Sequence, residues 1–313
     1  IAGGYTPDTV IWDIPTEFNP LCSWDGKAEN GVDPETCYKP KNYDDRFRGP
    51  VTIKQALSNS LNVPSVKVLY LAGINNAINL AESMGITTLK DRSRYGLSLV
   101  LGAGDVKLLD IVSAYGVFAT EGVRREPTGI LKVEDGNGRV LEEYADDGHE
   151  VMNEQTARVI TDILSDNNAR APMFGLYSPL YLGERPAAAK TGTTQDPNEP
   201  TKARDAWIIG YTPSLVAGVW TGNNNNVPIE KGGAGVMAAG PIWREFMLAA
   251  LKDAPIETFT KPEPIITEKP ILNGQYQASV ILKVNKTNGL LASAATPPEL
   301  VEERTFNEIH EIL

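Results

Sequence analysis

The chain has 313 residues, of which 42% are hydrophobic and 22% are charged, and its formal net charge is -11. This length and composition fit one large domain, or a domain with an appendage, that buries a substantial core. The scattered acidic excess argues against a nucleic-acid-binding surface and against a basic patch for a membrane surface.

Few features of the sequence report on the cellular compartment. No apolar run approaches the length of a membrane span, and Ile1 does not begin a signal peptide, so we expect any anchor or export signal to lie outside these residues. Cys22 and Cys37 lie in one polar loop without histidines at ligand spacing. They form either a disulfide, which implies export, or two unpaired thiols.

Histidine is scarce, because only His149 and His310 occur. A catalytic triad built on histidine is therefore hard to form, and a His-rich metal cluster is excluded. We interpret both histidines as surface residues and expect no metal and no cofactor.

The N-terminal part of the chain changes character near residue 50. Residues 1–50 are rich in proline turns and predict a long surface excursion. From Val51 the pattern becomes helical, and Pro64 can open a second helix that ends at Gly73. Ser60-Leu61-Asn62 is thus expected at a tight junction between two helices.

The middle of the chain reads as helices interrupted by one hairpin. Helices are expected over residues 74–84, over residues 108–118 with Asp105 as a plausible N-cap, and from Asn153 as N-cap through Leu164. The turn residues between Val133 and Val140 predict a β-hairpin.

Three apolar strands follow at short spacing, over residues 185–194, 205–211 and 215–222. Their short connections require antiparallel neighbours. A closing helix is expected over residues 239–250, followed by a proline-rich linker and a small β-rich appendage. The apolar face of that helix is expected to contain Ala239, Ile242, Trp243, Phe246, Met247 and Ala250.

Several polar or aromatic groups receive structural interpretations. Trp207 and Trp220 could form a sugar-stacking platform, but we expect them to face a helix layer as core. The run Asn223 to Asn226 is typical of a turn. The carboxylates of residues 142–143 and 146–147 lack apolar surroundings and are expected to be solvated charge.

The most informative stretch is Lys190-Thr191-Gly192-Thr193, within the strand of residues 185–194. On a strand it presents a cation and hydroxyl donors, and Gly192 lets another backbone lie close alongside. The pattern suits capture of a peptide carboxylate. Taken alone, it also fits a lysine at the end of an edge strand.

Ser60 and Asn62 admit two interpretations. Serine and asparagine are common at helix ends because they satisfy free N–H groups. A hydroxyl without an activating histidine, however, needs a nearby amine to move its proton. On this second interpretation the junction faces the Lys190 strand across a cleft.

Taken together, several segments resemble the transpeptidase domain of penicillin-binding proteins, most of all the bifunctional class A, which is linked to a glycosyltransferase. The resemblance covers nearly the whole chain. The segments are Arg48–Thr52 ahead of Ser60-Leu61-Asn62, Tyr95–Gly102, Lys190–Thr194, Asp205–Pro213 and Gly235–Phe246, in the family's order and at similar spacing.

The resemblance implies an α/β (α+β) fold in which an antiparallel sheet is flanked by helices, as in penicillin-binding proteins and β-lactamases. We predict an N-terminally incomplete transpeptidase domain over residues 1–257. Residues 258–313 are predicted to form a linker and a small β-rich C-terminal appendage.

One element of the family's signature is missing. No serine in this sequence has a lysine three residues later, so the Ser-x-x-Lys that supplies the nucleophile and its base is absent. In the family that element lies shortly before the Tyr-Thr-Pro seen here at Tyr5–Pro7. We therefore expect the nucleophile segment to belong to another piece, of the same protein or of a second chain, and this chain to be inactive alone.

The resemblance also assigns roles to the residues that are present. Ser60 would relay a proton to the leaving nitrogen, Lys190 would keep the local potential positive, and Asn62 would hold the substrate amide. Thr191 and Thr193 would bind the terminal carboxylate beside Gly192. The Thr193 N–H would be one of two oxyanion donors.

The function implied is that of a peptidoglycan D,D-transpeptidase, which crosslinks stem peptides through an acyl-serine intermediate and binds β-lactams such as penicillin. Its expected location is the extracytoplasmic face of the membrane, with no nucleic-acid partner. Two alternatives stay open: a non-catalytic wall-peptide-binding module, and a related D,D-carboxypeptidase or β-lactamase-type hydrolase.

Overall fold

The computed structural model of the chain describes residues 4–28, 31–196, 199, 202–229 and 235–309. The chain divides into two compact units. The first unit comprises residues 1–14, 47–53 and 265–313, and the second comprises residues 15–46 and 54–264. The predicted domain boundary after residue 257 stays a prediction.

The first unit contains two antiparallel strand pairs. β1 (Val10–Asp13) pairs with β2 (Gly49–Thr52), and β10 (Gln277–Asn285) pairs with β11 (Val301–Ile309). Two short 3-10 turns are also present, η4 (Pro270–Asn273) and η5 (Pro298–Leu300). The fully buried carboxylate of Asp13 accepts a hydrogen bond of 3.0 Å from the Arg48 N–H.

The pair β1–β2 corrects our interpretation of the N-terminal region. We predicted surface turns up to residue 50 and a helix from Val51, but Val51 lies in β2 and the helix begins at Ile53. The strand forms because its backbone pairs with a segment about forty residues earlier, which a local pattern does not reveal.

The second unit contains the α-helices that the structure describes, apart from Ile53, the first residue of α1, and several of their ends follow local sequence signals. Gly73, with a φ of 82°, ends α2, and the Asn153 side chain accepts from the Gln155 N–H at the start of α5. The predicted cap at Asp105 is wrong, because α4 begins later and Lys107 occupies its N-cap position. The helices are α1 (Ile53–Ser58), α2 (Asn62–Ala72), α3 (Ile74–Ser83), α4 (Leu108–Ala119), α5 (Glu154–Ser165), α6 (Asn167–Phe174), α7 (Gly235–Ala238) and α8 (Gly240–Ala250), with 3-10 turns η1 (Pro34–Thr36), η2 (Arg92–Arg94) and η3 (Leu97–Leu101).

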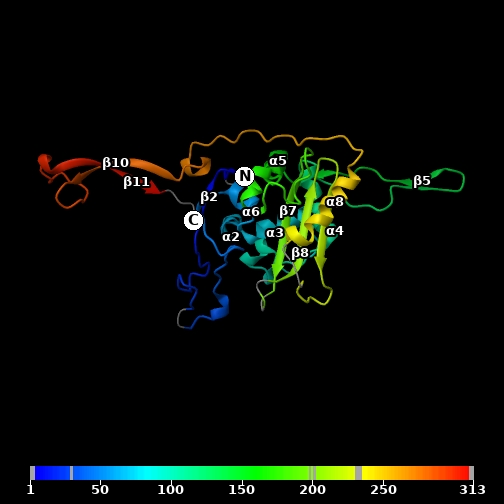
Figure 1. Ribbon diagram of the computed structural model, residues 1–313, viewed down its shortest axis with the longest axis horizontal. Helices are drawn as coiled ribbons and strands as arrows, with labels where there is room; N and C mark the ends of the chain where they lie inside the picture. The colour runs from blue at the N-terminus through cyan, green and yellow to red at the C-terminus, as the bar shows by residue number, and fades with distance from the viewer. Residues whose placement is uncertain (1–3, 29–30, 197–198, 200–201, 230–234, 310–313) are drawn as a thin grey trace. The chain divides into compact units, whose positions relative to one another are not determined.

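The central feature of the second unit is a three-stranded antiparallel sheet in the order β7 (Ala188–Gln195), β8 (Ala203–Tyr211), β9 (Val216–Gly222). Helices lie beside this sheet in Figure 1. On one face Ile208 packs with Trp243 of α8. On the other face Tyr211 packs with Leu164 of α5 and with aromatic residues of α4. The antiparallel sheet flanked by helices is therefore confirmed.

Two smaller strand pairs complete the second unit. β3 (Val123–Arg124) pairs with β6 (His149–Glu150), and the predicted hairpin is confirmed as β4 (Lys132–Glu134) and β5 (Val140–Glu143). The hairpin projects from the rest of this unit (Figure 1). His149 is exposed, as predicted, whereas His310 lies outside the described residues.

Exposure departs from the sequence pattern on α8 and on the sheet. Ile242 and Phe246 were expected on the buried face of α8, but each is 52% exposed. Trp207 and Trp220 were expected in the core, but both are half-buried, with ring centroids 6.4 Å apart.

No helix in the described ranges is both long and apolar enough to cross a membrane.

Cys22 and Cys37 form a disulfide, with Cα atoms 5.8 Å apart. This decides between the two alternatives that the sequence left open. The bond closes a loop within residues 15–46 of the second unit.

Candidate functional site

The junction between α1 and α2 places Ser60 in an uncommon backbone conformation. The Leu61 N–H donates to the Ala56 carbonyl at 2.9 Å, and the Ser60 N–H donates to the Leu57 carbonyl at 3.2 Å. These bonds form a Schellman motif, whose left-handed residue is usually glycine. Ser60 takes that position with a φ of 54°. For a residue with a Cβ this conformation costs about 1–2 kcal/mol.

β7 brings Lys190 to the Ser60 hydroxyl. Lys190 lies opposite Ile209 in the central strand, so its side chain is on the sheet face that α4 and α5 cover. The Lys190 Nζ donates to Ser60 Oγ at 2.6 Å and to the Thr191 carbonyl at 2.8 Å. Two segments separated by 130 positions in the sequence thus meet in one polar contact.

The surroundings of Lys190 change its acidity. Burial disfavours the charged ammonium and lowers the pKa of Lys190 from 10.5 to about 8. Beside the amine lies a cavity of only about 10 Å³, lined among others by Ser58, Arg170 and Lys190. It has room for about one water molecule. Lys190 is therefore poised to gain or lose a proton close to neutral pH.

Arg170 is a second cation at this cavity that the sequence did not reveal. Its guanidinium is buried and donates to the carbonyls of Leu164 and Leu180, each at 3.0 Å. Burial lowers the pKa of Arg170 to about 10. Its Nε donates to Asn167 Oδ1 of the same helix at 3.1 Å. The sequence does not mark this site, because the two carbonyls that hold the guanidinium belong to other segments.

The remaining residues of β7 line its two faces alternately. Gly192 lies opposite Trp207, and a Cβ at Gly192 would come within 3.3 Å of the Trp207 Cβ. Thr193 Oγ1 accepts a hydrogen bond of 2.9 Å from the Gly235 N–H at the start of α7. A Cβ at Gly235 would lie 2.4 Å from the Gly192 carbonyl oxygen, so only glycine fits there. From the sequence, Gly235 was recognised only as the first residue of the family-like segment Gly235–Phe246, and no role was predicted for it.

Asn62 does not join the contact between Ser60 and Lys190. Its Nδ2 donates to the Lys41 carbonyl at 2.8 Å. The structure thus brings Ser60 and Lys190 together, with the Thr191 carbonyl as a second acceptor for the amine. The Asn62 side chain is turned toward the loop before β2. The roles of these residues stay predictions.

The chain matches the family model of the penicillin binding protein transpeptidase domain over residues 21–248. The chain belongs to this family. A curated relative, penicillin-binding protein 1A of Aquifex aeolicus, is 35% identical over 224 residues, which cover 71% of this chain and 29% of that protein. Penicillin-binding protein 2D of Bacillus subtilis is 33% identical over 271 residues, covering 85% of this chain and 36% of that protein.

Solved structures show the same penicillin-binding protein fold. The penicillin-binding protein PonA1 of Mycobacterium tuberculosis has 27% identity and a TM-score of 0.69, covering 88% of this chain and 69% of that one. For the fold alone, penicillin-binding protein 1A of Haemophilus influenzae has a TM-score of 0.68 at 23% identity, over 97% of this chain and 45% of that one. The chain spans about a third of the length of the curated relatives named above.

Proposed function

We propose that this transpeptidase domain contributes the proton-relay and carboxylate-binding side of a peptidoglycan D,D-transpeptidase site that also binds penicillin. The observation that carries the proposal is the 2.6 Å contact between Lys190 Nζ and Ser60 Oγ. An amine and a hydroxyl at this distance can pass a proton between them without a histidine.

The charge of Lys190 suits the substrate's terminal carboxylate. A protonated amine with a pKa of about 8 is mostly charged at neutral pH, and little water competes for it at its buried side. Because Thr193 Oγ1 already accepts the Gly235 N–H, its own proton is directed to another acceptor. A carboxylate beside Thr191 and Thr193 would supply that acceptor.

β7 is an edge strand of the described sheet, since only β8 pairs with it. An extended stem peptide can therefore align along its free edge, as peptides do when they add a strand to a sheet. Gly192 lies on the same face of β7 as Lys190 and has no side chain that would obstruct a peptide approaching there. In this pose the Thr193 N–H would serve as an oxyanion donor, and Asn62 would turn from Lys41 to the substrate amide.

The proposed reaction requires an acylating serine from outside these 313 residues, because no Ser-x-x-Lys occurs among them. That hydroxyl would attack the penultimate D-alanine carbonyl of a stem peptide. A C–O bond forms, the C–N bond breaks, and the departing D-alanine takes its proton through Ser60. The amine of a neighbouring stem peptide then resolves the acyl-enzyme.

The proposed location and partners follow from the same chemistry. Peptidoglycan lies outside the cytoplasmic membrane, so we place the site on the extracytoplasmic side, with β-lactams as ligands. The disulfide Cys22–Cys37 agrees with an oxidising compartment. PonA1, which is similar to this chain, has been solved in complex with penicillin V.

The test is intact mass spectrometry of the full-length protein after incubation with benzylpenicillin. We expect one covalent adduct, formed about a hundredfold or more slowly in Lys190→Ala and Ser60→Ala. Lys252→Ala, which removes an exposed lysine in the turn after α8, should leave the rate unchanged. Absence of any adduct on the full-length protein would support a non-catalytic module instead.

Product analysis then separates transfer from hydrolysis. With a stem peptide and an acceptor amine, a transpeptidase gives the crosslinked peptide. A carboxypeptidase or β-lactamase-type enzyme would give the hydrolysed product, and that outcome would overturn the assignment of transfer.

A further inference from the structure

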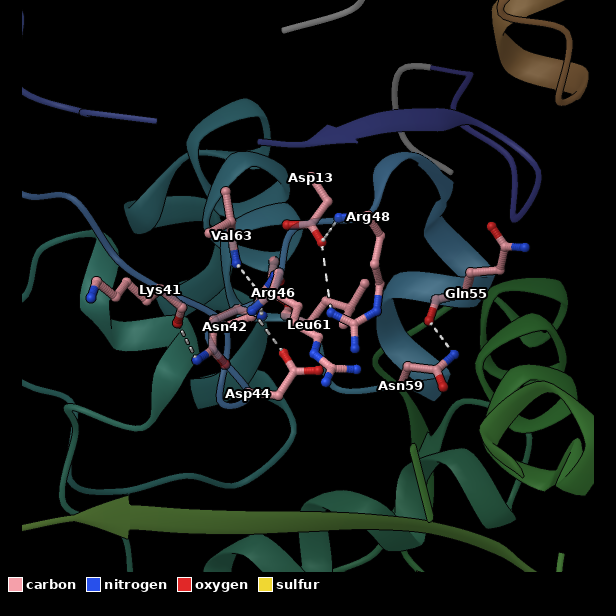
Figure 2. Close-up of polar contacts among 12 residues, drawn as sticks. Asp13, Lys41, Asn42, Asp44, Arg46, Arg48, Gln55, Asn59, Leu61 and Val63 are labelled. Atoms are coloured by element: carbon pink, nitrogen blue, oxygen red, sulfur yellow. Dashed lines mark hydrogen bonds and ion pairs between the residues drawn. The ribbon is translucent and has the colours of Figure 1, made fainter. Parts of the chain in front are cut away.

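Two buried asparagines outside the predicted site hold the Ser60 junction from opposite sides. Asn59, the residue before Ser60, is 8% exposed, and Asn42, in the loop before β2, is 4% exposed. Both are drawn in Figure 2. A left-handed serine persists only where its surroundings fix the backbone, so these contacts bear directly on Ser60.

Asn59 fastens the end of α1 to α6. Its Nδ2 donates to the Gln55 carbonyl one turn earlier at 2.9 Å and to the Ala169 carbonyl of α6 at 3.0 Å. The contact with Gln55 is visible in Figure 2. Since Ala169 belongs to another helix, Asn59 fixes where the last turn of α1 stands, and with it the adjacent Ser60.

Asn42 caps the start of α2 from outside that helix. Leu61 occupies the N-cap position and offers no side-chain acceptor. The Asn42 Oδ1 accepts instead from the N–H of Asn62 at 2.8 Å and from the N–H of Val63 at 3.2 Å. Asn42 and Val63 are labelled in Figure 2. Its Nδ2 donates to the Arg46 carbonyl at 2.8 Å, which orients the amide. The loop thereby replaces the missing cap.

We propose that Asn42 and Asn59 are positioning residues that hold Ser60 against Lys190. This inference rests on the proposed function, because it assigns the purpose of the two amides to the Ser60 hydroxyl. The Asn59 Nδ2 donates hydrogen bonds that fix the end of α1, before Ser60. The Asn42 Oδ1 accepts hydrogen bonds from the first N–H groups of α2, after Ser60. The two amides fix the flanks of a junction whose hydroxyl must stay within hydrogen-bond distance of an amine.

The first experiment measures the second-order rate constant of acylation of the full-length protein by a fluorescent penicillin. Misplacing a reacting group by about 1 Å can cost a hundredfold, so Asn42→Leu and Asn59→Leu should each lose about tenfold to a hundredfold. Asn42→Asp keeps the accepting oxygen at a helix N-terminus but loses the donor to the Arg46 carbonyl, so it should lose clearly less than Asn42→Leu.

Asn76 offers a matched control for Asn59. Its Nδ2 donates to the Ala72 carbonyl one turn earlier at 2.8 Å, but it is exposed, and among the residues that the structure describes its amide bonds no other helix. Asn76→Leu should leave the acylation rate unchanged. If Asn76→Leu and Asn59→Leu lower the rate equally, the positioning role is refuted.

A double-mutant cycle distinguishes positioning from general destabilisation. On a Ser60→Ala background, Asn59→Leu should change the rate by less than about twofold, because the group it positions is gone. An equal loss on both backgrounds would overturn the inference. If Asn59→Leu does not fold, the comparison of Asn42→Asp with Asn42→Leu tests the proposal instead. Equal losses of acylation rate in these two variants would contradict the positioning role. If wild type itself is not acylated, the proposed function fails instead.

Discussion

The two segments that meet at Ser60 and Lys190 are stabilised in different ways. β7 is held along its length by pairing with β8 and by the core around Trp243. The junction at Ser60 is held by a few hydrogen bonds from Asn42 and Asn59. Strand pairing and core packing therefore stabilise β7, whereas the position of the Ser60 hydroxyl depends on a few hydrogen bonds. Changes in the two segments should affect different measurements.

The largest expected effect comes from removing the core beneath the strand. Trp243 is fully buried, and its ring occupies the space above Gly210, where a Cβ would lie 2.3 Å from Cζ2. Trp243→Ala should lower the free energy of unfolding by about 3–5 kcal/mol. Denaturant unfolding measures this change.

Ile242, the neighbour of Trp243 on α8, provides the control because it is half exposed. Ile242→Ala should change the free energy of unfolding by at most about 0.5 kcal/mol. Similar losses for both variants would show that the sheet does not depend on this core.

The second prediction uses the pKa of Lys190, which burial lowers to about 8. Above that pH the amine becomes neutral, so a rate that needs its charge should fall about tenfold per pH unit, or about a hundredfold by pH 10. Stopped-flow acylation of the full-length protein across pH 6 to 10 measures the profile.

Lys190→Arg sharpens this prediction, because a guanidinium keeps its charge throughout that range. The variant should be slower than wild type but should lose the alkaline fall. An alkaline fall that persists in Lys190→Arg would assign the titration to another group.

The third prediction concerns the helix that supports the strand face. Thr161 of α5 and the Tyr211 hydroxyl of β8 share a buried hydrogen bond of 2.9 Å. Thr161→Val leaves the phenol without this partner and should cost about 1–3 kcal/mol of unfolding free energy. Thr161→Ser, which keeps the hydroxyl, should lose less, and an equal loss would attribute the effect to packing alone.

The smallest expected effect is a difference in stability between two variants of Ser60, at the junction between α1 and α2. At a φ of 54°, Ser60→Gly should be more stable than Ser60→Ala by about 1 kcal/mol, since only the glycine relieves the left-handed strain. Thermal unfolding measures the difference. Both variants lack the hydroxyl, so both should lose acylation alike despite their difference in stability. Equal stabilities would argue that Ser60 carries no strain.

The fold was largely predictable because its signals are local. Gly73 and Asn153 marked helix ends, and the short connections between apolar strands required the antiparallel sheet. α6 escaped prediction because it is short, contains Pro172 and follows α5 directly. β1 and β2 escaped because their pairing joins distant segments.

The site was predictable only where a motif named its residues. Ser60 and Lys190 were singled out by resemblance, and the structure places them in contact. Asn42, Asn59 and Arg170 were not, because each acts on backbone atoms of another segment and leaves no spacing pattern. The orientation of Asn62 toward Lys41 likewise depends on a loop contact.

The disulfide between Cys22 and Cys37 has a practical consequence for anyone who produces this domain. It closes a loop in the segment that also supplies Asn42, and such a crosslink removes about 3 kcal/mol of chain entropy from the unfolded state. Material purified from a reducing cytoplasm would lack that restraint. A free-thiol count on each batch would reveal the difference before any rate constant is compared between laboratories.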